Sequence, residues 1–444
     1  MSDLAAFAAA YASGALPSDV LGEALARIDV ADSVWIARVP DAIVAARTRA
    51  LDACTPAERA ALPLFGVPFA AKDNIDVAGV PTTAACPAFA YVPERSATVI
   101  LRLESAGAVV IGKTNMDQFA TGLVGTRSPY GVAKNPFDAR YIPGGSSSGS
   151  AVAVARGLVP FALGTDTAGS GRVPAGFTGT VGLKPTPGRI STAGVVPACR
   201  SLDCVSVFAL GVDDAQTILH AAAGGDPLDP FSRAGNDTAR AIPAAFRFAV
   251  PLPEQREFFG DAVAAAAFAA AVERFEALGG TAVPVDLAPC FEAAALLYEG
   301  AFVAERTAAF GDFADTHPEA LLDVTRRIVA GGRRFTAVEA FRAMYRVRTL
   351  HAIAQPIFAA APVLVVPTSP TIYTIDEVEN EPFALNARLG TYTNFVNFFG
   401  WSALAIPSAQ YPNGVPIGVT LIGPSFADDS LVGLARRYLA RIRA

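Results

Sequence analysis

The chain has 444 residues, of which 52% are hydrophobic and only 17% are charged, and its formal net charge is −6 at pH 7. This length and this low charge favour a compact globular protein, with one large core or two modest ones, over a disordered chain. The negative balance disfavours a general surface for polyanions, because such a surface needs clustered lysine and arginine. Nucleic acid is therefore not an expected partner.

The cysteines and histidines give no sign of a disulfide framework or a metal centre. The five cysteines lack CxxC spacing, and the three histidines are isolated from one another along the chain. Disulfide frameworks and zinc sites, in contrast, have characteristic ligand spacings. We expect cysteines that act as buried apolar residues, no metal and no cofactor.

The N-terminal residues and the most apolar helix candidate both bear on location. No basic segment precedes Arg27, which argues against a secretory signal and predicts a cytoplasmic protein. The alanine-rich run at residues 262–272 is bounded by Asp261 and Glu273, so it is too short to span a membrane. We therefore expect no membrane association.

In chain order, the predicted elements begin with a helical N-terminal arm at residues 1–60. Residues 2–52 show helical periodicity, and the segment after Leu16 is typical of a helix start, because Ser18 or Asp19 can cap it. From residue 63 onward, short β-branched runs alternate with glycine turns and helical patterns. This alternation is typical of an α/β sheet covered by helices on both faces.

A segment rich in glycine, aspartate and proline at residues 224–243 predicts an exposed loop between two parts of the chain, residues 61–230 and 245–427. After this loop the α/β alternation resumes. Strands are predicted at residues 247–250, 282–285, 363–366 and 419–422, and helices at residues 262–278, within 289–347 and at 430–443. Because no internal repeat is present, we predict a single domain over residues 1–444, whose last part, residues 428–444, holds the terminal helix.

Two serine-bearing glycine loops and an upstream lysine carry the chemistry. The loops lie at residues 144–151 and 164–172, with no histidine between them. A serine hydroxyl is a poor nucleophile without a positioned base. Residues 68–74 are typical of a short apolar strand that ends in Lys72, and burial would lower the pKa of this lysine enough for it to act as a neutral base. Lys72, Ser146 and Ser170 are therefore the predicted catalytic residues.

These segments resemble the amidase signature family, whose catalytic unit is a lysine, a serine whose preceding peptide bond is cis, and a nucleophilic serine. The spacing of Lys72, Ser146 and Ser170 agrees with the family pattern, and the resemblance covers residues 64–210, with weaker matches through the final helix. It implies a mixed β-sheet flanked by helices on both faces. It also implies that Ser146 relays a proton between Ser170 and Lys72.

The resemblance further implies roles for the loop around Ser170. Backbone N–H groups are preorganised partners for a developing oxyanion, and the oxyanion hole would be formed by the amides of Thr167, Ala168, Gly169 and Ser170. Asp166 and Arg172 resemble a family ion pair that fixes the shape of the loop. Ala168 stands where the family usually has a glycine, a small departure that still leaves room.

Three alternatives apply to these motifs. Lys113 is a rival base, although its family counterpart is structural. Residues 145–149 also fit the GxSxG nucleophile elbow, with Ser147 as nucleophile, but residues 138–141 before it make a poor central strand. The glycines could instead bind phosphate, yet no GKS or GKT ending follows and no GxGxxG is complete.

Further segments are more similar to allophanate hydrolases than to other amidases; they lie at residues 117–127, 191–204 and 225–227. Allophanate is a small urea-like amide with a carboxylate, so its pocket is expected to contain a cation. Arg306 lies eight positions after Tyr298 and is predicted to share one side of a helix with it, where its guanidinium could bind the carboxylate. The alternative for Arg306 is a surface charge beside Glu305. Gly122 is a candidate backbone contact to the substrate on resemblance alone.

The resemblance implies hydrolysis of allophanate to ammonia and an unstable N-carboxycarbamate, and we also expect a homodimer. Allophanate hydrolases commonly have a further C-terminal domain, which is expected to be absent from this chain, since Ala444 comes just after the terminal helix. A broad-specificity amidase, or the amidase component of a tRNA-dependent amidotransferase, would keep the same three catalytic residues but need a different pocket. The acidic balance disfavours tRNA, and the presence of all three residues disfavours a non-catalytic scaffold.

Overall fold

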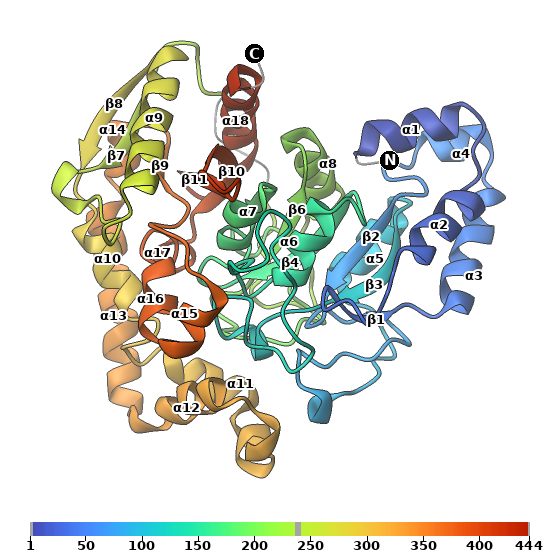
Figure 1. Ribbon diagram of the computed structural model, residues 1–444, viewed down its shortest axis with the longest axis horizontal. Helices are drawn as coiled ribbons and strands as arrows, with labels where there is room; N and C mark the ends of the chain where they lie inside the picture. The colour runs from blue at the N-terminus through green and yellow to red at the C-terminus, as the bar shows by residue number, and fades with distance from the viewer. Residues whose placement is uncertain (1–2, 236–240, 443–444) are drawn as a thin grey trace.

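The computed structural model describes residues 3–235 and 241–442. Its strands form one mixed 11-stranded sheet, in the order β1-β3-β2-β4-β6-β5-β10-β11-β9-β7-β8 (Figure 1). The strands are β1 (Trp35–Arg38), β2 (Pro68–Lys72), β3 (Val109–Thr114), β4 (Phe161–Asp166), β5 (Val181–Lys184), β6 (Cys204–Ala209), β7 (Phe246–Pro251), β8 (Gly280–Val285), β9 (Leu364–Pro367), β10 (Ser402–Gln410) and β11 (Pro416–Gly423). This sheet confirms the predicted α/β fold.

Helices cover the sheet and extend beyond it. Those of the first half are α1 (Leu4–Ala12), α2 (Pro17–Ala26), α3 (Asp41–Asp52), α4 (Pro56–Ala60), α5 (Thr98–Ser105), α6 (Ser148–Ala155), α7 (Val173–Thr178) and α8 (Val212–Ala222). Those of the second half are α9 (Ala262–Ala277), α10 (Ala288–Ala295), α11 (Val303–Thr316), α12 (Asp323–Gly331), α13 (Ala337–Ala354), α14 (Ile357–Ala360), α15 (Ile375–Asn380), α16 (Ala384–Leu389), α17 (Phe395–Phe398) and α18 (Asp428–Ile442). Single 3₁₀ turns lie at Pro87–Phe89, Gln118–Ala120, Pro253–Gln255, Pro318–Ala320 and Gly332–Arg334.

The sheet is mixed, with its parallel pairs in two groups separated by antiparallel pairs. Strand β2 pairs in parallel with β3 and β4, and β7 pairs in parallel with β8 and β9. The other pairs are antiparallel. Parallel neighbours need a crossover, and the helices α5 and α9 lie in the crossovers from β2 to β3 and from β7 to β8.

The N-terminal arm contributes an edge strand that the sequence did not predict. Strand β1 pairs antiparallel with β3, and the ring of Trp35 lies directly over Gly112. A Cβ atom at Gly112 would come within 2.7 Å of this ring, so the absent side chain makes the close approach possible. A four-residue edge strand is specified by this tertiary contact more than by its own pattern.

The two faces of the sheet carry different helices. On β4, Leu163 belongs to the packing layer around α8, whereas Gly164 lies against Ser147 at the start of α6. Successive strand residues point to opposite faces, so α6 and α8 cover opposite sides. Helices α5 and α18 pack against α8, and α7 packs against α6, which makes the sheet the middle layer of the domain.

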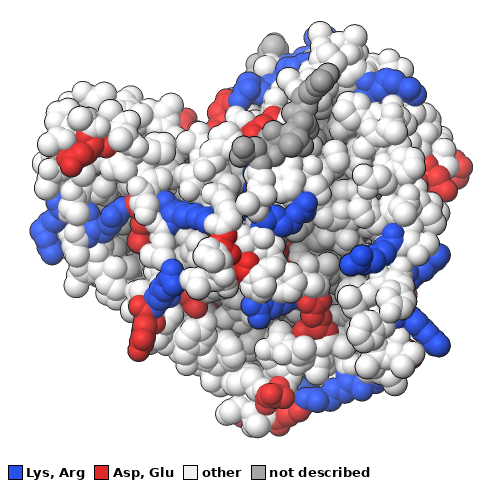
Figure 2. All heavy atoms as spheres, turned by 180° about the vertical axis from the view of Figure 1, so that it is seen from behind, with Lys and Arg blue, Asp and Glu red and all other residues white. Residues whose placement is uncertain are grey.

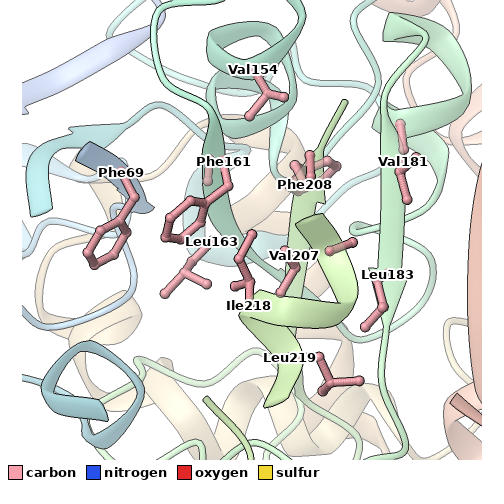
Figure 3. Close-up of a cluster of buried hydrophobic side chains, with 14 of the residues drawn as sticks. Phe69, Val154, Phe161, Leu163, Val181, Leu183, Val207, Phe208, Ile218 and Leu219 are labelled. Atoms are coloured by element: carbon pink, nitrogen blue, oxygen red, sulfur yellow. The ribbon is translucent and has the colours of Figure 1, made fainter. Parts of the chain in front are cut away.

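Apolar side chains from neighbouring strands fill the layer beneath α8 (Figure 3). The rings of Phe69 on β2 and Phe161 on β4 are stacked, with centroids 5.0 Å apart. Leu163 and Val207 lie next to Ile218 of α8 in the same view. All five side chains are buried, so this layer fixes β2 and β4, the two strands whose ends carry the candidate site.

The helical stretch within residues 289–347 consists of four α-helices, α10 to α13, joined by turns. The predicted loop at residues 224–243 holds no helix or strand in its described part, while residues 236–240 lie outside the described residues, as does Arg443 of the terminal helix. No described helix is both long and apolar enough to cross a membrane. On the face shown in Figure 2, positive and negative side chains are interspersed among uncharged ones.

Candidate active site

Lys72 is the last residue of β2 and is fully buried. Its Nζ atom lies 2.7 Å from Oγ of Ser146 and 2.7 Å from Oγ1 of Thr165. Burial lowers the pKa of Lys72 to about 7, and the carboxylates of Asp117 and Asp203 only partly oppose this shift. The lysine can therefore be neutral near pH 7 while it contacts the hydroxyl of Ser146.

Ser146 lies in the glycine loop that leads into α6, and the peptide bond between Gly145 and Ser146 is cis. Gly145 has no room for a side chain, because a Cβ atom there would come within 2.1 Å of the carboxylate of Asp117. The next serine, Ser147, is tied to β4, since its Oγ donates to the carbonyl of Thr165 and accepts from the amide of the same residue. Residues 138–141 form no strand, so the nucleophile-elbow interpretation lacks its structural context.

Thr165 is a member of the site that sequence reasoning missed. Its hydroxyl accepts from Nζ of Lys72 at 2.7 Å and from Nδ2 of Asn74 at 3.4 Å. Together with Ser146, it holds the lysine amine from two sides. The signal in the sequence was its position near the end of β4, four residues before Gly169 of the loop that carries Ser170.

The loop that carries Ser170 follows β4 and is closed by a buried ion pair. Asp166 accepts from Nε and Nη2 of Arg172 at 2.9 Å each, and also from the amide of Gly171 at 3.0 Å. Burial alone would raise the pKa of the Asp166 carboxyl, but the guanidinium of Arg172 lowers it. The predicted ion pair is therefore present, and it joins the two ends of the loop.

The same loop presents unpaired backbone amides. The N–H groups of Ala168, Gly169 and Ser170 donate to no other described residue, although buried amides are nearly always paired. Gly169 has φ +144°, and a Cβ atom there would meet the Thr393 hydroxyl at 2.4 Å. A glycine is thus required where the backbone turns, and the turn leaves three successive donors available.

Asp203 is another residue of the site that the sequence did not predict. Its side chain stabilises the loop that carries Ser170. Its carboxylate accepts from Oγ1 of Thr167 at 2.5 Å and from the amides of Ala198 and Cys199 at 2.8 and 3.2 Å. Burial raises the pKa of Asp203 to about 6. Because Arg306 acts on this carboxyl electrostatically, Asp203 connects the Ser170 loop with the predicted substrate residues.

Lys113, the rival base, points away from the serines. In the register of β2 and β3, Lys113 is opposite Ala71, whereas Lys72 is opposite Thr114. Adjacent residues leave opposite faces of a strand, and Nζ of Lys113 accordingly lies 3.3 Å from a carboxylate oxygen of Asp73. This buried ion pair indicates a structural role.

Tyr298 and Arg306 meet, but not by the predicted route. Tyr298 lies in the turn after α10 and Arg306 lies on α11, so the prediction that they share one side of a helix is wrong. The turns at residues 296–302 bring them together instead, with Nη2 of Arg306 3.3 Å from Oη of Tyr298 and the guanidinium 5.2 Å from the centre of the ring. Arg306 is fully buried, so the alternative of a surface charge beside Glu305 is also wrong.

The surroundings of Arg306 leave part of its guanidinium free. Nη1 donates to Oγ1 of Thr121 at 3.1 Å, Nε has no partner, and no ion pair joins it to a described carboxylate. Gly122 follows Thr121 directly and has φ +157°. Tyr298 in turn packs in one cluster with Ala168 of the Ser170 loop. The three predicted substrate residues therefore lie around one region that borders the loop.

The described residues contain no group of three or more histidine, cysteine, aspartate or glutamate side chains that could hold a metal ion. The buried lysine and hydroxyl groups instead provide an acid-base relay, and the loop provides amide donors.

Together with the mixed sheet, these features define the class of the protein, which is an amidohydrolase. The chain belongs to the amidase family, because the family model described as Amidase matches residues 19–432. Among solved structures, the allophanate hydrolase of Kluyveromyces lactis is 43% identical with a TM-score of 0.93, over 97% of this chain and 71% of that one.

Curated relatives point to two kinds of protein. Urea amidolyase of Lachancea kluyveri is 46% identical over 411 residues, which cover 92% of this chain and 22% of that protein. A glutamyl-tRNA(Gln) amidotransferase subunit from Symbiobacterium thermophilum is 36% identical over 453 residues, which cover 93% of this chain and 90% of that protein. The chain thus spans about a fifth of the urea amidolyases that it matches.

Proposed function

We propose that the chain hydrolyses allophanate and releases ammonia through a covalent acyl-enzyme. The single observation that carries this substrate is the fully buried guanidinium of Arg306, which makes no ion pair with a described residue. A buried charge is costly unless it is paired, and the carboxylate of allophanate would provide the missing partner. The likeness to an allophanate hydrolase and to urea amidolyases supports the same substrate.

In the proposed reaction, Lys72 acts as the base and Ser170 as the nucleophile. Neutral Lys72 takes the proton of the Ser146 hydroxyl, 2.7 Å away, while Ser146 takes the proton of Ser170. The oxygen of Ser170 then bonds to the carbonyl carbon of the terminal amide, and the carbonyl electron pair moves to oxygen. The amides of Thr167, Ala168, Gly169 and Ser170 would stabilise this oxyanion.

Collapse of the tetrahedral intermediate breaks the carbon–nitrogen bond. The proton held by Lys72 returns through Ser146 to the leaving nitrogen, which departs as ammonia. A water molecule then attacks the ester carbonyl and gives its proton to the same relay. This second step releases N-carboxycarbamate and restores the Ser170 hydroxyl, so the catalytic groups return to their starting protonation states.

Arg306, Tyr298 and Gly122 are proposed to bind the substrate. The unpaired Nε and the Nη atoms of Arg306 can bind a carboxylate in a bidentate manner. The Tyr298 hydroxyl already contacts this guanidinium and limits its orientation. Gly122 would offer backbone groups to the amide end, since the absence of a side chain lets the substrate approach the main chain.

A substrate panel tests this function. We expect kcat/KM to be highest for allophanate and lower by about 10-fold or more for biuret, which has an amide in place of the carboxylate. Malonamate keeps a carboxylate and should rank between the two. Ammonia release from each compound at equal enzyme concentration gives the ranking. A preference for glutamine would instead support an amidotransferase component, and equal rates for all four would support a broad-specificity amidase.

Arg306→Ala is expected to weaken the reaction with allophanate selectively. Loss of a charge-assisted pair worth about 1.5–3 kcal/mol predicts a fall in kcat/KM of roughly 10- to 150-fold. The reaction with biuret should change far less, because biuret offers no carboxylate. Steady-state kinetics with both substrates measures the difference.

Arg306→Lys and Arg326→Ala are the matched controls for this variant. The lysine keeps the charge without the planar fork, so an intermediate loss is expected. Arg326 is an exposed arginine of α12, and its removal should leave both rates unchanged. An equal fall for the two substrates in Arg306→Ala would assign Arg306 to packing, and no fall would place it outside the pocket.

The homodimer stays a prediction, which sedimentation equilibrium of the chain can test. We also infer a cytoplasmic location, because all five cysteines are free thiols and four of them are buried, as is usual in a reducing compartment.

A further inference from the structure

A pocket of about 330 Å³ lies beside the candidate substrate region, between α12 and α16 in the lower left part of Figure 1. Tyr298, whose hydroxyl contacts the guanidinium of Arg306, forms part of its wall. The volume is at the small end of the range for ligand pockets. A ligand of this pocket would therefore be small, and it would bind next to the Arg306 region, on the other side of Tyr298.

The pocket is cationic although the protein is acidic. Three arginines line it, namely Arg127, Arg327 and Arg334, and Glu299 is the one acidic residue among the described residues of the lining. The guanidinium groups thus outnumber the carboxylate by two, whereas the whole chain has a formal net charge of −6. Charge of one sign that gathers in a hollow attracts ions of the opposite sign. The lining therefore indicates an anionic ligand.

Arg127 is the buried arginine of this pocket, with only 4% of its surface exposed. Its guanidinium donates to the carbonyls of Thr121 and Pro382, while Nε has no partner and no ion pair joins it to a described carboxylate. The carboxylate of Asp117 accepts from the backbone amide of Arg127, not from the guanidinium. Because a buried charge is costly unless it is paired, this guanidinium lacks a counter-ion.

Arg127 and Arg306 lie on two sides of Thr121. Arg127 donates to the carbonyl of Thr121 at 2.9 Å, and Arg306 donates to its hydroxyl at 3.1 Å. Burial lowers the pKa of Arg127, and the positive charge of Arg306 adds to this effect. Each guanidinium also has an unpaired Nε. An anion in the pocket would offset the repulsion between the two cations.

The other two arginines of the pocket are exposed. The guanidinium of Arg334 lies 4.7 Å from the centre of the Phe335 ring and makes no ion pair with a described residue. The guanidinium of Arg327 lies 4.6 Å from the centre of the Phe383 ring, and its ion pair with Asp323 is long, at 3.9 Å. Contacts with aromatic faces orient a guanidinium without neutralising it, so both charges are available to a ligand.

The pocket runs inward from these exposed arginines to Arg127 and Asn386, which are both buried. Oδ1 of Asn386 accepts from the amide of Leu123 at 2.8 Å, and its Nδ2 group donates to no described residue. The inner end thus combines a guanidinium with a neutral amide donor. Planar guanidinium donors match the two oxygens of a carboxylate.

We propose that this pocket is an outer carboxylate site, where an anionic substrate binds before it reaches Arg306. A cationic pocket raises the local concentration of anions, and an anion held beside Arg127 is separated from Arg306 by Thr121 and Tyr298. The choice of a carboxylate rests on the proposed hydrolysis of allophanate. The binding test below needs no turnover, so it can fail or succeed independently of that hydrolysis.

The first test is a calorimetric titration of the 444-residue chain with malonate, a small dicarboxylate that has no amide to hydrolyse. In Arg306→Ala the inner site is lost, and binding of about one malonate per chain is expected at the outer site. Adding Arg327→Gln and Arg334→Gln should weaken this binding by about 10-fold or more. Arg333→Gln is the matched control, because Arg333 pairs with Asp315 and does not line the pocket.

Each other result of the titration would overturn the proposal. If Arg306→Ala binds no malonate, the outer site does not exist. If binding persists without the charges of Arg327 and Arg334, it lies elsewhere. Equal affinity for uncharged malonamide would exclude recognition of charge, and tighter binding of inorganic phosphate would exclude a carboxylate site. Circular dichroism of each variant confirms that these results refer to folded protein, and the substrate panel separately tests hydrolysis of allophanate.

The second test is kinetic and uses the chain with Arg306 intact. Arg327→Gln combined with Arg334→Gln should lower kcat/KM for allophanate by about 3- to 10-fold at low salt, mainly through KM. The loss should shrink at high salt, because salt screens the exposed charges. The reaction with neutral biuret should change far less. An unchanged kcat/KM for allophanate, or an equal fall for both substrates, would overturn binding at this pocket before Arg306.

Discussion

Ser170→Ala is expected to reduce ammonia release from allophanate by about 10³-fold or more, because the acyl-enzyme cannot form without the hydroxyl oxygen. The change removes one atom from a loop that is held by the Asp166–Arg172 ion pair and by glycine conformations, not by the serine side chain. The fold should therefore persist. Matched measurements of ammonia release and circular dichroism check both statements.

Substrate binding should survive this change, because Arg306 and Tyr298 are intact. Calorimetric titration of Ser170→Ala with allophanate should therefore report binding without turnover, which separates the nucleophile from the pocket. Ser148→Ala provides a matched control, since Ser148 is a buried serine of the other glycine loop whose hydroxyl has no hydrogen-bond partner. It should retain nearly full activity. More than a few per cent of activity in Ser170→Ala would exclude Ser170 as nucleophile.

Much of this site could be predicted because its residues lie in local patterns. A short apolar strand that ends in a lysine can be recognised from the sequence of that segment alone, and β2 ends at Lys72 as expected. The Asp166–Arg172 ion pair spans six positions, so its formation needs only a closed loop. The strands predicted in the second half are also apolar runs, and they match β7, β8, β9 and β11.

The remaining features depend on contacts between distant segments. Asp203 and Thr165 are ordinary polar residues in the sequence, and only the packing of β4 against neighbouring segments turns them toward Thr167 and Lys72. Tyr298 and Arg306 were predicted to share a helix, but turns at residues 296–302 separate Tyr298 from the helix that holds Arg306. Helical periodicity does not encode these turns. Tyr298 and Arg306 are therefore in contact, as predicted, but they do not share one side of a helix.

Lys72→Met is expected to reduce turnover nearly as much as loss of Ser170, by about 10²- to 10⁴-fold, because no other basic side chain of the described residues contacts the Ser146 hydroxyl. Methionine fills a similar volume and cannot accept a proton. In the unchanged enzyme the base is the neutral amine, and burial lowers the pKa of Lys72 to about 7. The rate should therefore fall about tenfold per pH unit below 7 and level off above it.

The pH profile alone would not separate this lysine from a histidine, whose ordinary pKa is near 6.5, so the variants are needed. Lys72→Arg keeps a cation that cannot lose its proton and should be as inactive as Lys72→Met at every pH. Lys113→Met removes the rival buried lysine and leaves Asp73 without its ion-pair partner, which should lower the free energy of unfolding by roughly 3–5 kcal/mol, while the folded fraction keeps the fall in rate below pH 7. Thermal unfolding and pH-dependent ammonia release distinguish these results. If Lys72→Met retains the activity and its fall below pH 7, while Lys113→Met loses both, the base is Lys113 and the relay through Ser146 is wrong.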